Sequence, residues 1–208
     1  PAVHAGLLAK RDNAEHMRRL KELKIQTIDV VIVNLYPFKQ TVMSGKGFDE
    51  VVENIDIGGP TMLRSAAKNS GDVVVLTDPA DYEKALSELE AGEVSRETRL
   101  YLMYKVYAHT AAYDSMISAY LAKKLDIDFP DSLTLAFEKK EQLRYGENPF
   151  QQAALYTDMF PVSNSIVNAR QENGKQLSYN NLNDSNGAIE LLKEFDEPTV
   201  VCLLYTSP

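Results

Sequence analysis

The fold is decided by residues 28–36, which read Ile28-Asp29-Val30-Val31-Ile32-Val33-Asn34-Leu35-Tyr36. An almost continuous apolar run predicts a β-strand that is buried on both faces, because a strand with one solvated face alternates apolar and polar residues. A second apolar run spans residues 73–76 and ends at Thr77-Asp78-Pro79. Predicted helices alternate with the two strands. This order predicts an α/β fold with a parallel sheet that is covered on both faces.

Helical periodicity outlines the elements around these strands. The expected helices span residues 13–24, 48–55, 61–69, 78–89 and 96–124. Pro60 suits the first position of the third helix, where its missing N–H removes no hydrogen bond. The last helix carries a broad apolar face, on which tyrosines are expected to pack with tethered hydroxyls. That face comprises Leu100, Met103, Val106, Tyr107, Thr110, Ile117, Tyr120 and Leu121.

The character of the chain changes near Asp131, after a loop-like stretch at residues 126–132. A change of this kind predicts a domain boundary. Beyond it, strands are expected at residues 133–137, 153–156 and 199–204, and a helix at 186–195. A polar block at 143–152 and a polar turn at 174–184 separate these elements.

Composition excludes several classes of protein. The 208 residues include 44% hydrophobic residues, which is ample for a core, and the net charge of −8 argues against binding nucleic acid over a whole surface. A local basic pocket for a small anion stays compatible with that charge. The one cysteine permits no internal disulfide, so a reducing compartment is expected. No apolar run approaches the ~20 residues that span a bilayer, and no leader is apparent, so we expect a soluble, cytoplasmic protein without a membrane partner.

The stretch from Asp56 to Lys68 carries the first candidate site. Gly58-Gly59 at a helix start leaves backbone N–H groups open to an anion or a polar ring edge, and Arg64 and Lys68 share one helical face. Lys68 follows two alanines, and a partly desolvated lysine can exchange protons near neutrality. A simple Gly-Gly turn with two solvated cations explains the spacing equally well.

Asn34 and Tyr36 lie at the carboxyl end of the first strand, where open α/β sheets bind ligands. Taken alone, the residues favour an ordinary strand-ending turn. In the later block, Arg144 offers a planar fork for phosphate and Tyr145 a ring that covers a base or sugar. The alternative there is a surface ion pair between Arg144 and Glu147.

Residues 180–184 are typical of a turn and a helix cap, with Asp184 or Ser185 as the capping residue. The three histidines have no metal-ligand spacing, so no metal site is expected. Glycine-rich nucleotide-binding loops of the known patterns are absent from the sequence.

Several strings in the chain together resemble one enzyme family. They are residues 1–9 (PAVHAGLLA), 33–38 (VNLYPF), 55–69 (IDIGGPTMLRSAAKN), 108–114 (AHTAAYD) and 143–149 (LRYGENP). These strings are collinear with those of the bifunctional purine biosynthesis family, which joins inosine monophosphate (IMP) cyclohydrolase to phosphoribosylaminoimidazolecarboxamide (AICAR) formyltransferase. The chain is identified on these strings as a member of that family.

The resemblance implies two domains. Residues 1–131 would be a methylglyoxal-synthase-like cyclohydrolase domain that lacks its N-terminal part, and residues 132–208 the beginning of a cytidine-deaminase-like formyltransferase domain. The first closes the purine ring of the formamido nucleotide without a metal or cofactor. The second takes a formyl group from 10-formyltetrahydrofolate as cosubstrate. Small nucleotides would be the ligands, and the full-length family member would be a homodimer.

The resemblance also assigns roles to individual residues. Lys68 would donate or accept the catalytic proton, Asp56 would assist it, and the Tyr36 hydroxyl would donate near the closing ring. The remaining substrate-binding residues would be Asn34, Leu35, Ile57, Gly58 and Arg64 for the cyclohydrolase, and Arg144, Tyr145 and Asn181 for the formyltransferase.

The chain departs from the family pattern at both ends and at Phe150, where the family has histidine. Leu204-Tyr205 replaces a Lys-His pair that would act in formyl transfer, and residues 202–208 are expected to be foreign sequence. Family segments that precede Pro1 are missing, which predicts an exposed sheet edge, a weakened core and little activity. The alternatives are a free-standing cyclohydrolase or methylglyoxal-synthase relative, which residues 143–149 oppose, and a catalytically dead nucleotide-binding or interaction module.

Overall fold

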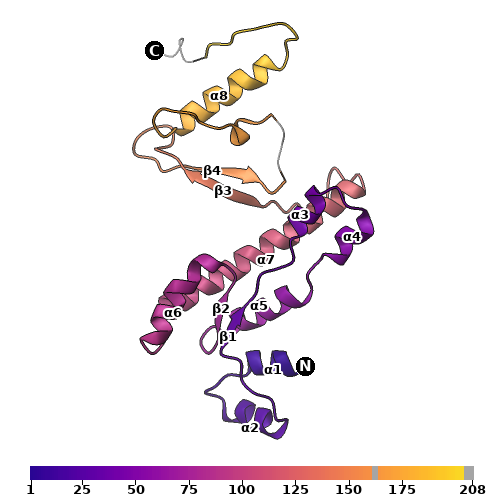
Figure 1. Ribbon diagram of the computed structural model, residues 1–208, viewed down its shortest axis with the longest axis vertical. Helices are drawn as coiled ribbons and strands as arrows, with labels where there is room; N and C mark the ends of the chain where they lie inside the picture. Colours follow the sequence, from indigo (N-terminus) through magenta and orange to yellow (C-terminus); the bar gives the residue numbers. More distant parts are fainter. Residues whose placement is uncertain (161–163, 204–208) are drawn as a thin grey trace. The chain divides into compact units, whose positions relative to one another are not determined.

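The structure, a computed structural model, describes residues 1–160 and 164–203 of the chain. The chain forms two compact units, Pro1–Thr134 and Leu135–Pro208, and each is described by itself (Figure 1). The first unit contains α1 (Ala2–Leu8), α2 (Ala14–Glu22), β1 (Val30–Ile32), α3 (Phe38–Met43), α4 (Phe48–Glu53), α5 (Gly58–Lys68), β2 (Val74–Leu76), the 3-10 turn η1 (Pro79–Asp81), α6 (Tyr82–Glu90) and α7 (Arg96–Lys124). The second contains β3 (Phe137–Gln142), β4 (Ala154–Asp158), the 3-10 turn η2 (Ile166–Asn168) and α8 (Tyr179–Leu192).

The predicted parallel sheet is confirmed, although it is small. β1 and β2 pair in parallel with Val30 opposite Val74 and Ile32 opposite Leu76. One further bond, from the Val33 N–H to the Leu76 carbonyl at 3.1 Å, extends the ladder. Among the described strands β1 pairs with β2 alone, so its other edge carries no strand.

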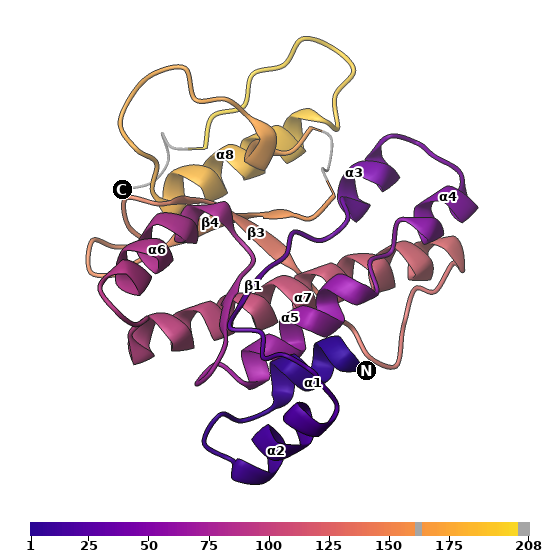
Figure 2. The same ribbon diagram turned by 60° about the horizontal axis from the view of Figure 1, so that its bottom comes forward.

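Two apolar clusters form the core of the first unit, one on each face of β2. Side chains alternate across a strand, so Val73 and Val75 join one cluster while Val74 and Leu76 join the other. The first cluster is completed by Leu7, Val31, Leu63, Ala66, Ala67 and Val106, and the second by Ala85, Val94 and Leu102. α5 and α7 lie side by side against the strands in both views (Figure 1, Figure 2).

The prediction that the first strand is buried on both faces is wrong. Val31 is buried in the first cluster, but Val30 is 40% and Ile32 55% exposed. The second cluster contains residues of β2, α6 and α7 but none of β1. The face of β1 that carries Val30 and Ile32 is therefore left open.

Several helices agree with prediction, and the exceptions have local causes. α2, α4, α6 and α7 form as expected, whereas the short helices α1 and α3 were not predicted. α5 begins at Gly58, so Pro60 occupies its third position, where its N–H would still lack a partner within the helix. Leu100, expected on the apolar face of α7, is 65% exposed because the buried stripe runs instead through Leu102, Val106 and Tyr113.

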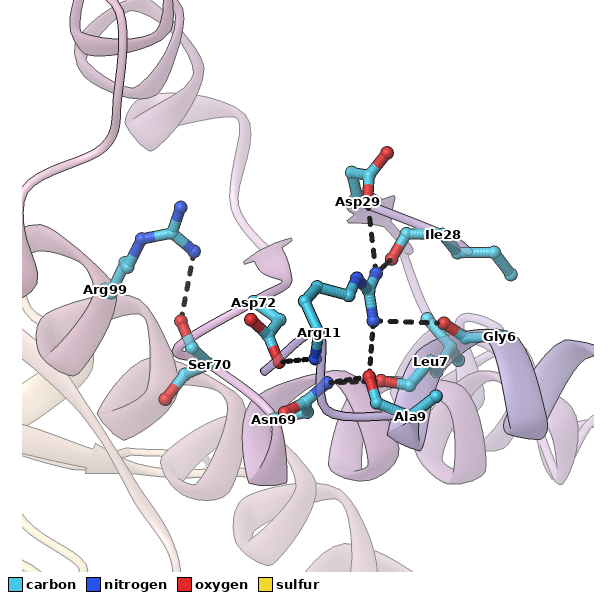
Figure 3. Close-up of polar contacts among 10 residues, drawn as sticks. All are labelled: Gly6, Leu7, Ala9, Arg11, Ile28, Asp29, Asn69, Ser70, Asp72 and Arg99. Carbon is cyan, nitrogen blue, oxygen red and sulfur yellow. Dashed lines mark hydrogen bonds and ion pairs between the residues drawn. The ribbon is translucent and has the colours of Figure 1, made fainter. Parts of the chain in front are cut away.

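Polar side chains tie the segment after α1 to the rest of the unit (Figure 3). The buried Asn69 amide donates to the carbonyls of Leu7 at 2.9 Å and Ala9 at 3.2 Å. The Arg11 guanidinium donates to the same Ala9 carbonyl at 2.6 Å and to the Ile28 carbonyl at 2.8 Å. We refer to Arg11 and Asn69 with the carbonyls they bind as the carbonyl clamp.

The second unit pairs β3 and β4 in antiparallel fashion and continues into α8. The strand predicted at 133–137 is wrong, since Leu133 and Leu135 are exposed and β3 begins at Phe137. The strand predicted at 199–204 is also wrong for residues 199–203, which have no strand conformation, and residue 204 lies outside the described residues.

α8 begins at Tyr179, seven residues before the predicted start. Its cap is Ser178, not Asp184 or Ser185, and a capping box joins Ser178 to Asn181. The Ser178 side chain accepts from the Asn181 N–H at 3.3 Å, while the Asn181 side-chain oxygen accepts from the Ser178 N–H at 3.1 Å. The asparagine-rich run therefore forms the first turns of the helix, because this reciprocal cap fixes its start earlier in the chain.

We expect Asn69→Ala to lower the free energy of unfolding by about 1–3 kcal/mol, because the Leu7 carbonyl would lose its side-chain donor and the Ala9 carbonyl would keep only Arg11. Asn54→Ala is the matched control, since the Asn54 amide donates to the Glu50 carbonyl at an exposed position. That control should cost below about 1 kcal/mol. Urea unfolding followed by circular dichroism measures both, and equal losses in the two variants would contradict the role given to Asn69.

Candidate functional site

One carboxylate joins the exit of β1 to the start of α5. Asp56 Oδ1 accepts a hydrogen bond from the Gly59 N–H at 2.7 Å, and Asp56 Oδ2 accepts one from the Tyr36 N–H at 3.2 Å. The carboxylate thus partners one of the open N–H groups at the helix start, as a helix-capping aspartate does. Asp56 therefore lies beside the backbone of Tyr36, whereas the resemblance paired Asp56 with Lys68.

Gly59 is the glycine that this junction requires. A Cβ at Gly59 would lie 2.6 Å from Leu35 Cδ2 and 2.7 Å from Asp56 Oδ2, whereas a Cβ at Gly58 would meet nothing within 4 Å. Gly59 is buried, and its missing side chain lets the strand exit and the carboxylate reach the helix. Gly58 therefore has the open backbone that was predicted for both glycines, whereas the Gly59 N–H donates to Asp56 and a side chain at Gly59 would clash.

The residues predicted to frame a ligand border this junction and face solvent. Asn34, Gly58 and Ile57 are exposed, the last at 74%, and the Tyr36 side chain is 57% exposed. Leu35 is half-buried against Gly59. The carboxyl end of β1 and the first turn of α5 thus form one accessible edge.

The junction rests on Tyr113 of α7, which lies beside the apolar face that was predicted for this helix. The buried Tyr113 hydroxyl accepts from the Asp56 N–H at 2.9 Å and donates to the Asn54 carbonyl at 3.4 Å. Burial raises the pKa of Tyr113, which keeps the hydroxyl neutral and able to donate. The expected tethering of a core tyrosine hydroxyl is confirmed here.

Arg64 and Lys68 line a pocket of about 370 Å³ further along α5. The pocket is completed by Leu8, Pro60, Thr61, Ser65 and Tyr107. Thr61 and Ser65 donate their hydroxyl protons to helix carbonyls four residues back, so the two cations are its strongest donors. Among the described residues neither cation has a carboxylate within ion-pair distance.

The prediction that Lys68 is partly desolvated is wrong, because its side chain is exposed at the end of α5. Lys68 also lies about 15 Å along the helix from Gly58, at 1.5 Å per residue. The structure therefore does not bring Lys68 to Asp56. Asp56 and Lys68 border the same exposed stripe. The stripe begins at Ile57, just before α5, and continues through Thr61 and Arg64 at helical spacing.

A second charged group lies beyond the carboxyl end of β2, and the sequence did not single it out. Lys105 Nζ contacts Asp78 Oδ2 at 2.5 Å and Asp81 Oδ2 at 2.6 Å. The hydrogen bond from Lys105 holds the pKa of Asp78 below its usual range. Burial acts to lower the pKa of Lys105, but its bonds to both carboxylates raise it overall. The one signal in the sequence for this charged group was Asp78-Pro79 after the second strand, which was interpreted as the start of a helix.

In the second unit the Arg144 side chain contacts the side chain of the next residue, Tyr145. Its guanidinium lies 4.8 Å from the Tyr145 ring centroid and donates to the Tyr145 hydroxyl at 3.2 Å. The alternative of an Arg144–Glu147 ion pair is not found among the described contacts. Backbone bonds from the Arg144 N–H to the Leu177 carbonyl and from the Tyr179 N–H to the Tyr145 carbonyl place this pair beside the start of α8, and thus near Asn181.

Residues 146–151 form a tight loop next to that pair. Gln151 closes it, since its side-chain oxygen accepts from the Glu147 N–H at 2.9 Å and its carbonyl accepts from the Gly146 N–H at 2.9 Å. Phe150 at the tip is 98% exposed. Among the described residues no group of three or more His, Cys, Asp or Glu could hold a metal ion.

Taken together, the first unit defines a mixed α/β protein whose small parallel sheet carries polar groups at its carboxyl edge. Comparison with known families narrows this class. The profile of the "MGS-like domain" matches residues 3–61, and that of the "AICARFT/IMPCHase bienzyme" matches residues 66–208. The chain belongs to the AICARFT/IMPCHase bienzyme family.

Curated relatives agree with this family. The chain is 56% identical to a protein of Ruminiclostridium cellulolyticum and 55% identical to one of Acetivibrio thermocellus, each named "Bifunctional purine biosynthesis protein PurH". Both matches include all of this chain, which spans 41% of the length of each relative. A solved structure described as "Crystal structure of ForH" is 37% identical, with a TM-score of 0.48 over 56% of this chain and 61% of that chain. Within the described residues, no helix has the length and apolarity needed to cross a membrane.

We expect Gly59→Ala to lower the free energy of unfolding by about 1–3 kcal/mol, because the added methyl group must displace Leu35 and the Asp56 carboxylate. Gly58→Ala, which meets nothing, should leave stability unchanged or raise it by up to about 1 kcal/mol. Urea unfolding measures both variants, and the Tyr36 amide resonance should move only in Gly59→Ala. A harmless Gly59→Ala would show that Leu35 and Asp56 are not held as described.

The Lys105 ion pairs should make stability depend on pH. Because the pKa of Asp78 is lowered on folding, its contribution is present above about pH 4 and is lost as the pH falls through the lowered value. The stability difference between wild type and Lys105→Met should therefore shrink below about pH 4. Lys123→Met, at an exposed position of the same helix, is the control, and its difference from wild type should stay flat with pH.

Proposed function

We propose that the protein to which these residues belong acts as an IMP cyclohydrolase and AICAR formyltransferase in de novo purine biosynthesis. The observation that carries the proposal is the match of residues 66–208 to the bienzyme family, together with 56% identity to a relative of that name. The two cations that share one pocket without a carboxylate partner support it, because the ligands would be phosphorylated nucleotides.

In the proposed cyclohydrolase reaction, the carboxamide nitrogen of the formamido nucleotide attacks the formyl carbon, and water is lost as the purine ring closes. Lys68 would donate or accept the proton, and the Tyr36 hydroxyl would donate near the closing ring. Asp56 keeps an unused lone pair on each oxygen while it holds Gly59 and Tyr36, so it can still accept a proton from a substrate amide.

We propose that the nucleotide lies along the exposed stripe of α5. One end would contact the edge formed by Asn34, Leu35, Ile57 and Gly58, and the other the pocket of Arg64 and Lys68. This arrangement follows from the length of the helix, since a ligand confined to either end could not contact both Asp56 and Lys68. No metal or cofactor takes part in this reaction as proposed.

For the formyltransferase we propose that Arg144 binds the AICAR phosphate, with Tyr145 and Asn181 beside the nucleotide and 10-formyltetrahydrofolate as the cosubstrate. The backbone bonds that hold residues 144–145 against the start of α8 support a shared site. The predicted departure at Leu204-Tyr205 lies outside the described residues, as does most of the stretch 202–208 that we propose to be foreign sequence. Cys202, at its start, is exposed.

We assign residues 1–131 to the cyclohydrolase domain, with a methylglyoxal-synthase-like sheet that further N-terminal strands would complete, and residues 132–208 to the beginning of a cytidine-deaminase-like transferase domain. The compact units Pro1–Thr134 and Leu135–Pro208 support a boundary near this position, and the MGS-like profile over residues 3–61 and the open edge of β1 support a sheet of that kind. The full-length protein would be a homodimer.

The proposed function is tested by ring-closure and formyl-transfer assays on the full-length gene product. Lys68→Ala should reduce ring closure by about 100-fold or more, because a positioned proton donor contributes 10²–10⁴-fold, and should leave formyl transfer unchanged. Lys123→Ala is the control, because Lys123 is an exposed lysine of α7 that has none of the proposed site roles. The 208-residue chain alone should show little turnover. Family-like ring closure by the 208 residues, or by Lys68→Ala, would contradict these assignments.

A catalytically dead nucleotide-binding module is the second candidate. Phe150 favours it, because an almost fully exposed phenylalanine stands where the family pattern has a histidine. Nucleotide binding by the full-length product without either reaction would establish this alternative.

A further inference from the structure

Two short helices separate Tyr36 and Asp56 along the chain. We refer to residues 37–53, which contain α3 and α4, as the excursion. It lies beside the C-terminal half of α7 in both views (Figure 1, Figure 2). Its two ends nevertheless meet, since the Tyr36 N–H donates to Asp56 Oδ2 at 3.2 Å. Closing a loop costs chain entropy, so other contacts must hold its base together.

Tyr113 of α7 contacts both ends of the excursion. At the C-terminal end, its hydroxyl accepts from the Asp56 N–H at 2.9 Å and donates to the Asn54 carbonyl at 3.4 Å. At the N-terminal end, its ring packs edge-on against Phe38, with the two centroids 6.1 Å apart. One side chain thus joins the exit of β1 and the segment that carries the carboxylate to the same helix.

Tyr113 is itself firmly held. It is 3% exposed, and the Phe38 ring against which it packs is 1% exposed. Phe38 also meets Tyr120 edge-on at 5.8 Å, and Tyr120 stacks on Phe48 at 6.4 Å, so one aromatic cluster joins α3, α4 and α7. Aromatic pairs in such geometries stabilise beyond the area they bury. The Tyr113 hydroxyl is therefore a fixed point for the residues that it binds.

The hydrogen bond to Tyr113 bears on the direction of the Asp56 carboxylate. The two carboxylate oxygens accept from the Gly59 and Tyr36 N–H groups, while the Asp56 N–H donates to Tyr113. The last of these bonds ties the backbone of Asp56 to α7. Without it, the carboxylate would depend on the two bonds from the segments that it joins, and its position would be less sharply defined.

We propose that Tyr113 is a positioning residue for ring closure, which holds the Asp56 backbone so that the Asp56 carboxylate meets the substrate amide. The reaction and the part of Asp56 in it rest on the proposed function, whereas the bond between Asp56 and Tyr113 does not. Because a misplacement of about 1 Å can cost about 100-fold in rate, a residue that never touches the substrate can still affect kcat.

Tyr113→Phe tests this role in the full-length gene product, because it removes the hydroxyl and keeps the ring against Phe38. The kcat of ring closure should fall by roughly two- to tenfold, the factor that corresponds to one hydrogen bond. KM should change little, since the carboxylate is proposed to act on the amide as the ring closes. Formyl transfer by the same protein should be unchanged.

Tyr120→Phe is the matched control. Tyr120 belongs to the same helix and the same aromatic cluster, but among the described residues its hydroxyl makes no hydrogen bond. This variant should keep the wild-type kcat. A loss of the same size in Tyr120→Phe would show that the cluster, and not the bond to Asp56, affects turnover.

A double-mutant cycle with Asp56→Asn separates positioning from stability. Asparagine keeps a side-chain oxygen that can accept from the Gly59 N–H, but it lacks the charge of the carboxylate. If Tyr113 acts through that carboxylate, Tyr113→Phe should lower kcat far less in the Asp56→Asn background than in wild type. A residue that only stabilised the fold would lower Tm in both backgrounds and leave kcat unchanged.

Hydrogen exchange followed by mass spectrometry reports the bond without any turnover. In Tyr113→Phe the Asp56 N–H loses its acceptor, so the peptide that covers residues 54–58 should exchange faster than in wild type. The same peptide should exchange at the wild-type rate in Tyr120→Phe.

The outcomes distinguish this inference from the proposed function. A wild-type protein that closes no ring would overturn the proposed function and the role of Tyr113 in it, while the exchange rates would still show whether Tyr113 holds Asp56. When ring closure is present, three results would overturn the inference: a wild-type kcat in Tyr113→Phe, an equal loss in the Asp56→Asn background, or unchanged exchange at residues 54–58.

Discussion

The carbonyl clamp formed by Arg11 and Asn69 is the constraint on which the first unit depends. The sheet consists of two strands of three residues each, so backbone pairing can fix little beyond the strands. The clamp connects the segment after α1 to α5 and to the strand entrance at Ile28 through side-chain donors (Figure 3). It keeps α1 where Leu7 can complete the apolar core and Leu8 can line the pocket.

α5 is held at both ends and is open between them. Asp56 partners the helix start, and Asn69 caps its end while donating to the segment after α1. Its inward face, with Leu63 and Ala67, is buried, and its outward stripe carries Arg64 and Lys68. A rigid helix with one free face can present two cations at a constant spacing to a ligand.

Local patterns predicted the elements whose causes are local. Continuous apolar runs predicted the strands and their parallel pairing. Helical periodicity predicted α2 and α7, and the structure adds that Asn13 and Ser95 cap them. Where an element was missed or shifted, its residues also carried the signal of a different local structure. The asparagines after Ser178 suggested a turn, but the reciprocal cap between Ser178 and Asn181 turns the same residues into helix. Strand propensity at 133–136 was not enough to form a strand, because within the described residues no strand pairs with this stretch, and Leu133 and Leu135 stay exposed.

The sequence by itself determined the α/β class, the family and the residues that border the candidate sites, because these depend on residue order and spacing. Tertiary structure alone decided which of those residues meet. Asp56 meets Tyr36 and Gly59 through its short side chain, while Lys68 is separated from it by the length of α5. Tyr107 and Arg64 lie 43 positions apart in the chain, and only the packing of α5 on α7 brings them into contact. Distance along a chain does not reveal such pairs, since they arise from how whole helices pack.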